Sequence, residues 1–311
     1  MPTVRKSAYR LLVLSAFLLL NRVFVYAQTE APFKMEPVGE EAFQVLHQFF
    51  QYDQGIPLEA RIVEKQDNPN HVREKIVFRG VRDSRVPGYL AIPKTGAPPY
   101  PCVLQLHGLT GSKSDWWQDD GYISGGRVTK GLLEAGFAVL ALDAQYHGER
   151  ISNNDYESAG VMIFQQGWFN RSREMMVQST VEYRRAIDYL NTRTEIDTTR
   201  IGVIGYSMGG MMTFSLTGVE PRIKVSVACV TPTIKDRFGA TAPHNFAAAV
   251  DGRPFLMVMG RSDPYYVVEE AQQLHSLIDS PTKELVFYDS DHRLPVEYTG
   301  KAVAWFQNHL K

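Results

Sequence analysis

The chain has 311 residues, of which 44% are hydrophobic and 22% are charged, with 33 basic and 34 acidic side chains. This composition fits a globular protein, and the length suffices for one large α/β domain with a sizeable core. The balanced charge excludes the strongly basic footprint of a nucleic-acid-binding protein, so no nucleic-acid partner is expected.

Residues 1–27 differ from the rest of the chain. A basic segment at 5–10 precedes the apolar stretch Leu11–Leu20, and Val25 and Ala27 place small residues at positions −3 and −1 of a cleavage point after Ala27. This pattern predicts a signal peptide and therefore a periplasmic or secreted protein, with no stable membrane insertion after cleavage. An uncleaved membrane anchor is the alternative.

Beyond the leader, residues 28–311 show no repeat and no linker, which favours a single domain. After a helix around Glu40–Tyr52, strand-like and helix-like runs alternate along the chain. The strand candidates are Lys75–Phe78, Gly88–Ile92, Cys102–His107, Ala138–Asp143, Ile201–Tyr206, Val225–Val230, Phe255–Gly260 and Glu284–Tyr288. The helix candidates are Gly126–Ala135, Arg173–Asn191, Met208–Gly218, Val267–Ile278 and Val296–Leu310. An early hairpin followed by this alternation predicts a mostly parallel sheet with helices on both faces.

Two long segments, His147–Phe169 and Pro232–Ala248, fit neither kind of element. Each follows a predicted strand, and loops at the carboxyl ends of parallel strands surround the ligand crevice of an open α/β sheet. The two segments are therefore candidate lids or binding surfaces, with plain surface insertions as the alternative.

The sequence Gly205-Tyr206-Ser207-Met208-Gly209 lies between a predicted strand and a predicted helix. In such a sharp strand–turn–helix the serine adopts strained backbone angles, and the glycines avoid collisions with neighbouring elements. The serine hydroxyl then stands clear of the sheet. Ser207 is therefore the candidate nucleophile, and a glycine-rich turn with an incidental serine is the alternative.

A serine hydroxyl needs a base, usually a histidine held by a carboxylate. In this architecture the order along the chain is serine, acid, histidine. Asp263 and His292 each follow a predicted strand in that order, so they are the candidate acid and base. Asp291 competes as the acid, but it is too close to His292 in sequence to orient its ring easily, and we interpret it as a loop-capping residue.

The reaction also needs two backbone amides aimed at a developing oxyanion. Met208 directly follows the nucleophile, and the turn His107–Gly111 ends the third predicted strand, so the amides of Met208 and Leu109 are the candidate donors. His107 itself is interpreted as a buried, hydrogen-bonded loop histidine rather than as a base.

The remaining candidates have weaker signals. The segment Asp143–Arg150 mixes acidic, basic and histidine side chains and is interpreted as a hydrogen-bonded turn that shapes the crevice wall. The candidate substrate contacts are Trp117, His147, Trp168 and Phe246, although the tryptophan at 117 could instead anchor its loop to the core. Cys102 and Cys229 lie in apolar runs and are expected to be free buried thiols. No spacing of Cys and His suggests a metal, and neither a metal nor an organic cofactor is expected.

These motifs together resemble the α/β-hydrolase superfamily over residues 70–311. The His107–Gly111 turn, the Asp143–Arg150 turn and the Gly205–Gly210 segment are similar to those of the dienelactone-hydrolase and prolyl-oligopeptidase-related esterases, a group that includes feruloyl and acetyl-xylan esterases. The resemblance implies an eight-stranded sheet and a catalytic triad of Ser207, His292 and Asp263. Dienelactone hydrolases proper have cysteine at the nucleophile position, and oligopeptidases carry an additional propeller domain, so this chain departs from both.

The sequence therefore predicts an exported serine carboxylic-ester hydrolase that acts on a small-molecule ester with a short-chain or aromatic acyl group. One alternative is a small-peptide exopeptidase or amidase, for which Glu149, Arg150 and Arg237 are the only evident charged anchors. Another is a catalytically silent hydrolase-fold protein that binds a ligand. The sequence does not predict an oligomeric state.

Overall fold

The computed structural model describes residues 31–82 and 84–310. The predicted leader over 1–27 lies outside the described residues. Within them, no helix combines the length and the apolar character needed to cross a membrane.

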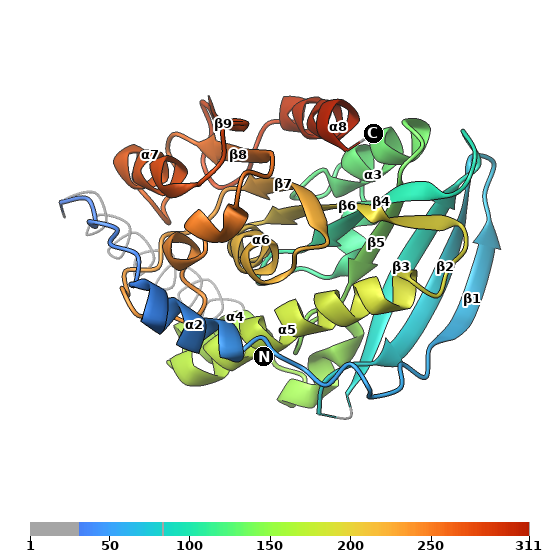
Figure 1. Ribbon diagram of the computed structural model, residues 1–311, viewed down its shortest axis with the longest axis horizontal. Coiled ribbons are helices and arrows are strands. Elements are labelled where there is room, and N and C mark those ends of the chain that lie inside the picture. Colours follow the sequence, from blue (N-terminus) through green and yellow to red (C-terminus); the bar gives the residue numbers. More distant parts are fainter. Residues whose placement is uncertain (1–30, 83, 311) are drawn as a thin grey trace, which may run out of the picture.

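A twisted nine-stranded sheet forms the centre of the described structure (Figure 1). The strands are β1 (Arg61–Asp67), β2 (His71–Arg79), β3 (Arg85–Pro93), β4 (Tyr100–Leu106), β5 (Ala138–Leu142), β6 (Ile196–Tyr206), β7 (Ile223–Cys229), β8 (Phe255–Gly260) and β9 (Lys283–Tyr288). Their order in the sheet is β1-β2-β3-β5-β4-β6-β7-β8-β9. The first three strands pair antiparallel, as does β3 with β5, and all the other pairs are parallel.

The predicted mostly parallel sheet is confirmed, but it has nine strands rather than eight. The missed strand is β1, at the edge of the sheet, where it pairs only with β2. Six of its seven residues are exposed, and its sequence, Arg-Ile-Val-Glu-Lys-Gln-Asp, has no apolar alternation. A strand that buries neither face carries no hydrophobic signal in its sequence, and only its ladder with β2 defines it.

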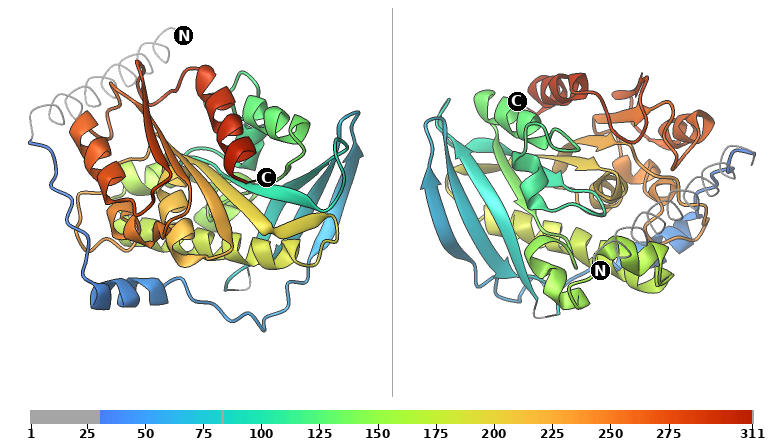
Figure 2. Two further views of the ribbon diagram at one scale, coloured as in Figure 1. Left: turned by 45° about the horizontal axis from the view of Figure 1, so that its top comes forward. Right: turned by 180° about the vertical axis from the view of Figure 1, so that it is seen from behind.

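Helices cover both faces of the sheet (Figures 1 and 2). The described helices are α2 (Glu40–Gln48), α3 (Gly125–Glu134), α4 (Ala159–Phe164), α5 (Phe169–Leu190), α6 (Met208–Val219), α7 (Val268–Leu277) and α8 (Glu297–His309). Helices α3 and α8 pack on one face, and α5 and α6 pack on the other. Alternate residues of β4 accordingly belong to different core clusters: Leu104 faces α5 and α6, whereas Val103 faces α3 and α8.

The parallel strands β4 to β9 all end at the same edge of the sheet. Their following loops therefore meet there, although they are far apart in sequence. Cys102 and Cys229 are buried free thiols inside β4 and β7, as predicted.

Candidate active site

Ser207 occupies the sharp turn between β6 and α6 with φ 58° and ψ −114°, a conformation that costs energy for a residue with a side chain. The two motif glycines permit this turn. A Cβ on Gly205 would lie 2.0 Å from the carbonyl oxygen of Gly209, and one on Gly209 would lie 2.2 Å from that of Leu106. The motif thus brings β4, β6 and α6 closer together than any other residue type allows.

Ser207, His292 and Asp263 form one chain of hydrogen bonds. The Oγ atom of Ser207 lies 2.8 Å from Nε2 of His292, and Nδ1 of the same ring lies 2.7 Å from Oδ2 of Asp263. Asp263 is buried, and its other oxygen accepts from the amide of Tyr265 at 2.9 Å. The structure therefore brings together three side chains that the sequence places 29 to 85 residues apart.

Asp291 points elsewhere. Its Oδ1 accepts from the amide of Arg293 at 2.8 Å, which makes it a cap of its own loop, as interpreted from the sequence.

The turn after β4 lies beside Ser207: a Cβ on Gly108 would lie 3.6 Å from the Cβ of the serine. Among the described residues, no backbone carbonyl accepts from the amide of Leu109 or of Met208, so both can donate to a ligand. Leu109 and Met208 also line the pocket in front of Ser207.

His107 is buried below this turn and has a structural role. Its Nε2 accepts from the amide of Ala144 at 3.0 Å, which places the proton on Nδ1, where it is donated to the carbonyl of Gly108 at 2.8 Å. Burial lowers the pKa of His107 to about 3, with a contribution from neighbouring His147, so the ring stays neutral and keeps accepting from Ala144.

A pocket of about 700 Å³ opens in front of Ser207. Residues from both irregular segments line it, including Ile163, Phe164 and Phe169 from the first and Pro232–Ile234 from the second. Met176, Met211, Tyr122 and Tyr265 complete much of the apolar wall. Both segments therefore fold over the carboxyl ends of the strands.

The sequence prediction missed several of these lining residues. Tyr265 lies two residues after Asp263, and Tyr206 belongs to the serine motif, so both had a local signal. Met176 lies on α5, and only the packing of α5 against the sheet brings it to the pocket.

None of the four predicted substrate contacts lines this pocket. Phe246 is fully buried, packs edge-on against Phe50 and lies beside Gly218 at the end of α6 away from Ser207. Trp168 directly precedes α5 and is 45% exposed, with the Arg171 guanidinium 5.3 Å from its ring. Neither side chain lines the pocket, because side-chain directions depend on packing that the sequence does not specify.

Trp117 is directed away from Ser207 as well. Its ring lies edge-on to Tyr89 and beneath the guanidinium of Arg73, against the outer strands β2 and β3. The position of Trp117 fits the other interpretation drawn from the sequence, in which this side chain anchors its loop to the core.

His147 does not line the pocket either. It is 4% exposed, and both ring nitrogens face backbone carbonyls, those of Gln145 and Leu109. It therefore belongs to the turn that follows β5 and has no free nitrogen for a substrate.

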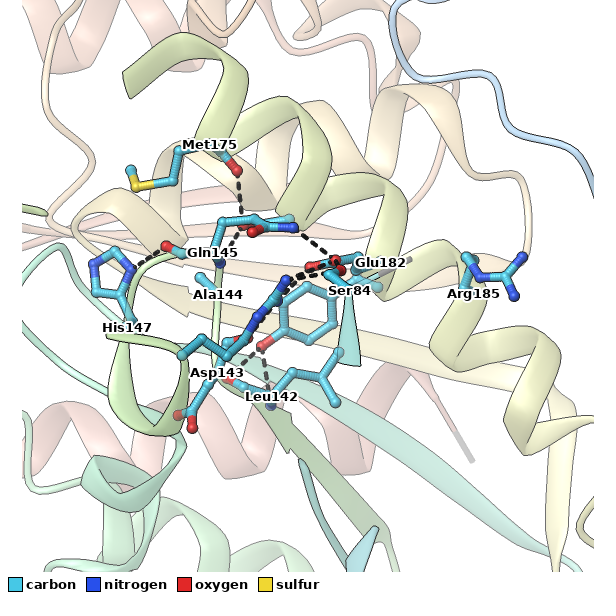
Figure 3. Close-up of polar contacts among 12 residues, drawn as sticks. Ser84, Leu142, Asp143, Ala144, Gln145, His147, Met175, Glu182 and Arg185 are labelled. Atoms are coloured by element: carbon cyan, nitrogen blue, oxygen red, sulfur yellow. Dashed lines mark hydrogen bonds and ion pairs between the residues drawn. The ribbon is translucent and has the colours of Figure 1, made fainter. Parts of the chain in front are cut away.

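The Asp143–Arg150 turn is a hydrogen-bonded structural unit (Figure 3). Asp143 accepts from the backbone amide and Nζ of Lys113 at 2.9 and 2.6 Å, and Arg150 forms a buried ion pair with Glu182 of α5 at 2.5 Å. The carboxylates of Asp143 and Glu149 raise the pKa of Lys113, although burial alone would lower it. No group of three or more potential metal ligands occurs among residues 31–82 and 84–310.

The charged anchors considered for an exopeptidase have other partners. Glu149 binds Lys75 and Lys113, Arg150 binds Glu182, and Arg237 lies 3.6 Å from Glu36. None of the three lines the pocket.

The nine-stranded α/β sheet, the strained serine turn and the Ser-His-Asp hydrogen bonds define an α/β-hydrolase of the serine hydrolase class. The family model for acetyl xylan esterase (AXE1) matches residues 49–238, and the chain belongs to this family.

One curated relative is a putative hydrolase by name. The putative hydrolase YtaP of Bacillus subtilis (strain 168) is 28% identical over 171 residues, which are 54% of this chain and 54% of that protein. The chain thus spans about half the length of this curated relative.

Among solved structures, acetyl xylan esterase 1 from Thermoanaerobacterium sp. JW/SL YS485 aligns with a TM-score of 0.67 at 15% identity, covering 93% of this chain and 98% of that one. Acetyl xylan esterase from Paenibacillus sp. R4 aligns with a TM-score of 0.68 at 16% identity, covering 94% and 99%. At 15% and 16% sequence identity, these two structural matches show that the fold is shared.

Proposed function

We propose that this protein is a serine carboxylic-ester hydrolase in which Ser207, His292 and Asp263 form the catalytic triad. The observation that carries the proposal is the continuous hydrogen-bond chain from Ser207 Oγ through the His292 ring to buried Asp263. Family membership and the open pocket in front of Ser207 support it.

In this mechanism His292 Nε2 takes the proton of Ser207 as its Oγ attacks the ester carbonyl. Asp263 holds the proton on Nδ1 and stabilises the imidazolium that forms. The amides of Met208 and Leu109 receive the oxyanion, and His292 then protonates the departing alcohol. Water, activated by the same ring, releases the acid and regenerates Ser207.

The proposed substrates are esters of short-chain or aromatic acids. The pocket supports this choice because aromatic side chains, those of Tyr122, Phe164, Phe169 and Tyr265, enclose it from several sides. Two structural neighbours are acetyl xylan esterases, which makes acetylated xylan a natural first polymer to test.

The test compares the wild type with S207A on p-nitrophenyl acetate, butyrate and octanoate. We expect kcat to fall by about 10⁴-fold or more in S207A, since removal of a triad nucleophile abolishes most of the rate enhancement. S215A, which removes a hydroxyl from within α6, is the matched control and should retain activity. Near-full activity of S207A would show that the nucleophile is elsewhere.

Two further assays separate the alternatives. Faster turnover of aminoacyl-p-nitroanilides than of esters would indicate an exopeptidase. A wild-type protein that a fluorophosphonate probe does not label would indicate a silent hydrolase fold.

We also propose that the protein is exported after cleavage behind Ala27, a proposal supported by the basic and apolar segments of residues 1–27. N-terminal sequencing of the mature protein should begin at Gln28. A first residue of Met1 or Pro2 would indicate an uncleaved leader.

A further inference from the structure

Two histidines connect the turn after β4 with the turn after β5. His107, in the first turn, accepts from the amide of Ala144 in the second. His147, in the second turn, contacts the carbonyl oxygen of Leu109 in the first through Nε2. The two rings lie beside each other, with their centroids 4.9 Å apart.

These contacts fix two consecutive peptide groups that line the pocket. A peptide group is planar, so anchoring its carbonyl also determines where the following N–H points. The Gly108 carbonyl accepts from His107 Nδ1 at 2.8 Å and from the amide of Gly111 at 3.0 Å, which orients the N–H of Leu109. The carbonyl of Leu109 depends on His147 and orients the N–H of Thr110.

The His147 ring is itself held firmly. Nδ1 lies 2.7 Å from the carbonyl of Gln145, and the ring is 4% exposed (Figure 3). Carbonyl oxygens only accept, and burial lowers the pKa of His147, so the neutral ring carries a single N–H and donates to one of the two carbonyls. With both nitrogens directed at the backbone, His147 cannot exchange a proton with a ligand in the pocket.

The turn that presents His147 is fixed to α5. Glu182 accepts from Arg150 Nη1 and Nη2 at 2.5 and 2.9 Å and from Gln145 Nε2 at 2.8 Å, and Ser179 Oγ accepts from the amide of Gln145 at 2.9 Å (Figure 3). This buried network, which joins the turn to α5 through several hydrogen bonds and an ion pair, gives the turn little freedom to move. His147 can therefore transmit the position of α5 to the turn beside Ser207.

We propose that His147 carries its proton on Nε2 and is a positioning residue for the oxyanion hole: by holding the Leu109 carbonyl it restrains the Leu109–Thr110 peptide, and with it the turn that presents the Leu109 amide to the reacting ester. This inference rests on the proposed function, because an oxyanion hole matters only if Ser207 attacks a carbonyl. Its physical basis is preorganisation: donors that are already oriented need no rearrangement when the charge develops.

The test uses H147L, which removes the ring N–H, and H147Q, which can return an N–H to the carbonyl of Leu109. H244L is the matched control, since His244 is equally buried and lies outside the pocket. For H147L we expect kcat on p-nitrophenyl acetate to fall about 10-fold or more with KM within about twofold, because outright loss of an oxyanion donor costs about 100- to 1,000-fold. H147Q should recover part of kcat, and H244L should retain the wild-type value.

A readout independent of activity accompanies the kinetics. Amide hydrogen exchange in the peptide covering residues 106–112 should be faster in H147L than in the wild type and H244L, while exchange in β7 stays unchanged. Unchanged exchange in residues 106–112, or a kcat of H147L within twofold of the wild type, would overturn the inference. An inactive wild-type enzyme would overturn the proposed function instead, and exchange would still show whether His147 restrains the turn.

Discussion

The phenol of Tyr206 donates to the carbonyl oxygen of His292 at 2.8 Å and accepts from the amide of Leu294 at 2.9 Å. A residue adjacent to the proposed nucleophile thus anchors the loop of the proposed base on both sides of that base. This loop has no helix or strand of its own, so few other contacts fix its backbone.

Replacing Tyr206 with phenylalanine should therefore lower kcat. We expect a loss of about 10- to 100-fold, since small displacements of a reacting group have effects of this size. Steady-state kinetics on p-nitrophenyl acetate checks it, with Y189F as the control, because Tyr189 Oη is also buried and accepts a hydrogen bond from Arg193 away from the pocket. Equal kcat values for the two variants would contradict the positioning role of Tyr206.

Stability should fall in mild acid because of His107. Burial lowers its pKa from 6.5 to about 3, so between these values the unfolded chain binds a proton that the folded chain does not. The neutral His107 ring therefore costs the folded state nothing above pH 6.5. As the pH falls below 6.5, proton binding favours the unfolded chain and the free energy of unfolding decreases. We expect a loss of about 2 kcal/mol from this group between pH 6.5 and 5, measured by urea unfolding.

The variant H107N tests that assignment. Its unfolding free energy should depend less on pH over the same interval, whatever its absolute stability. An identical slope in H107N and the wild type would show that other groups cause the acid sensitivity.

The glycine before the nucleophile should tolerate no side chain. In G205A the new methyl group would collide with the backbone at Gly209, and we expect destabilisation of at least about 2 kcal/mol together with loss of activity. G300A is the control: a Cβ there meets nothing within 4 Å, and alanine favours the helix by up to about 1 kcal/mol. Thermal unfolding should show a lower melting temperature for G205A and an unchanged or higher one for G300A. A G205A protein as stable as the wild type would disprove the steric argument.

Acyl-chain preference should depend on Phe164 and not on Trp168. Phe164 lines the pocket and Trp168 does not, so F164A should raise octanoate turnover relative to acetate by about fivefold or more. W168A should leave this ratio unchanged. A larger change in W168A than in F164A would place the acyl chain outside the described pocket.

The sequence by itself determined the features that are local. Gly205 and Gly209 flank Ser207 because only glycine fits so close an approach, and that requirement is visible in the motif. Runs of apolar residues predicted eight of the strands, because each of them packs side chains against a helix layer. The chain order of Ser207, Asp263 and His292 followed from the strands that precede them.

Only the tertiary structure decided which side chains surround the pocket. Trp168 and Phe169 are adjacent in sequence and both exposed, at 45% and 63%, yet only Phe169 lines the pocket. His147 was expected to contact the substrate and instead supports Leu109 from below, because the Arg150–Glu182 pair fixes its turn against α5. Edge strand β1 likewise exists through its ladder with β2 rather than through any apolar pattern. Side-chain direction depends on the packing of elements distant in sequence, and no local pattern encodes it.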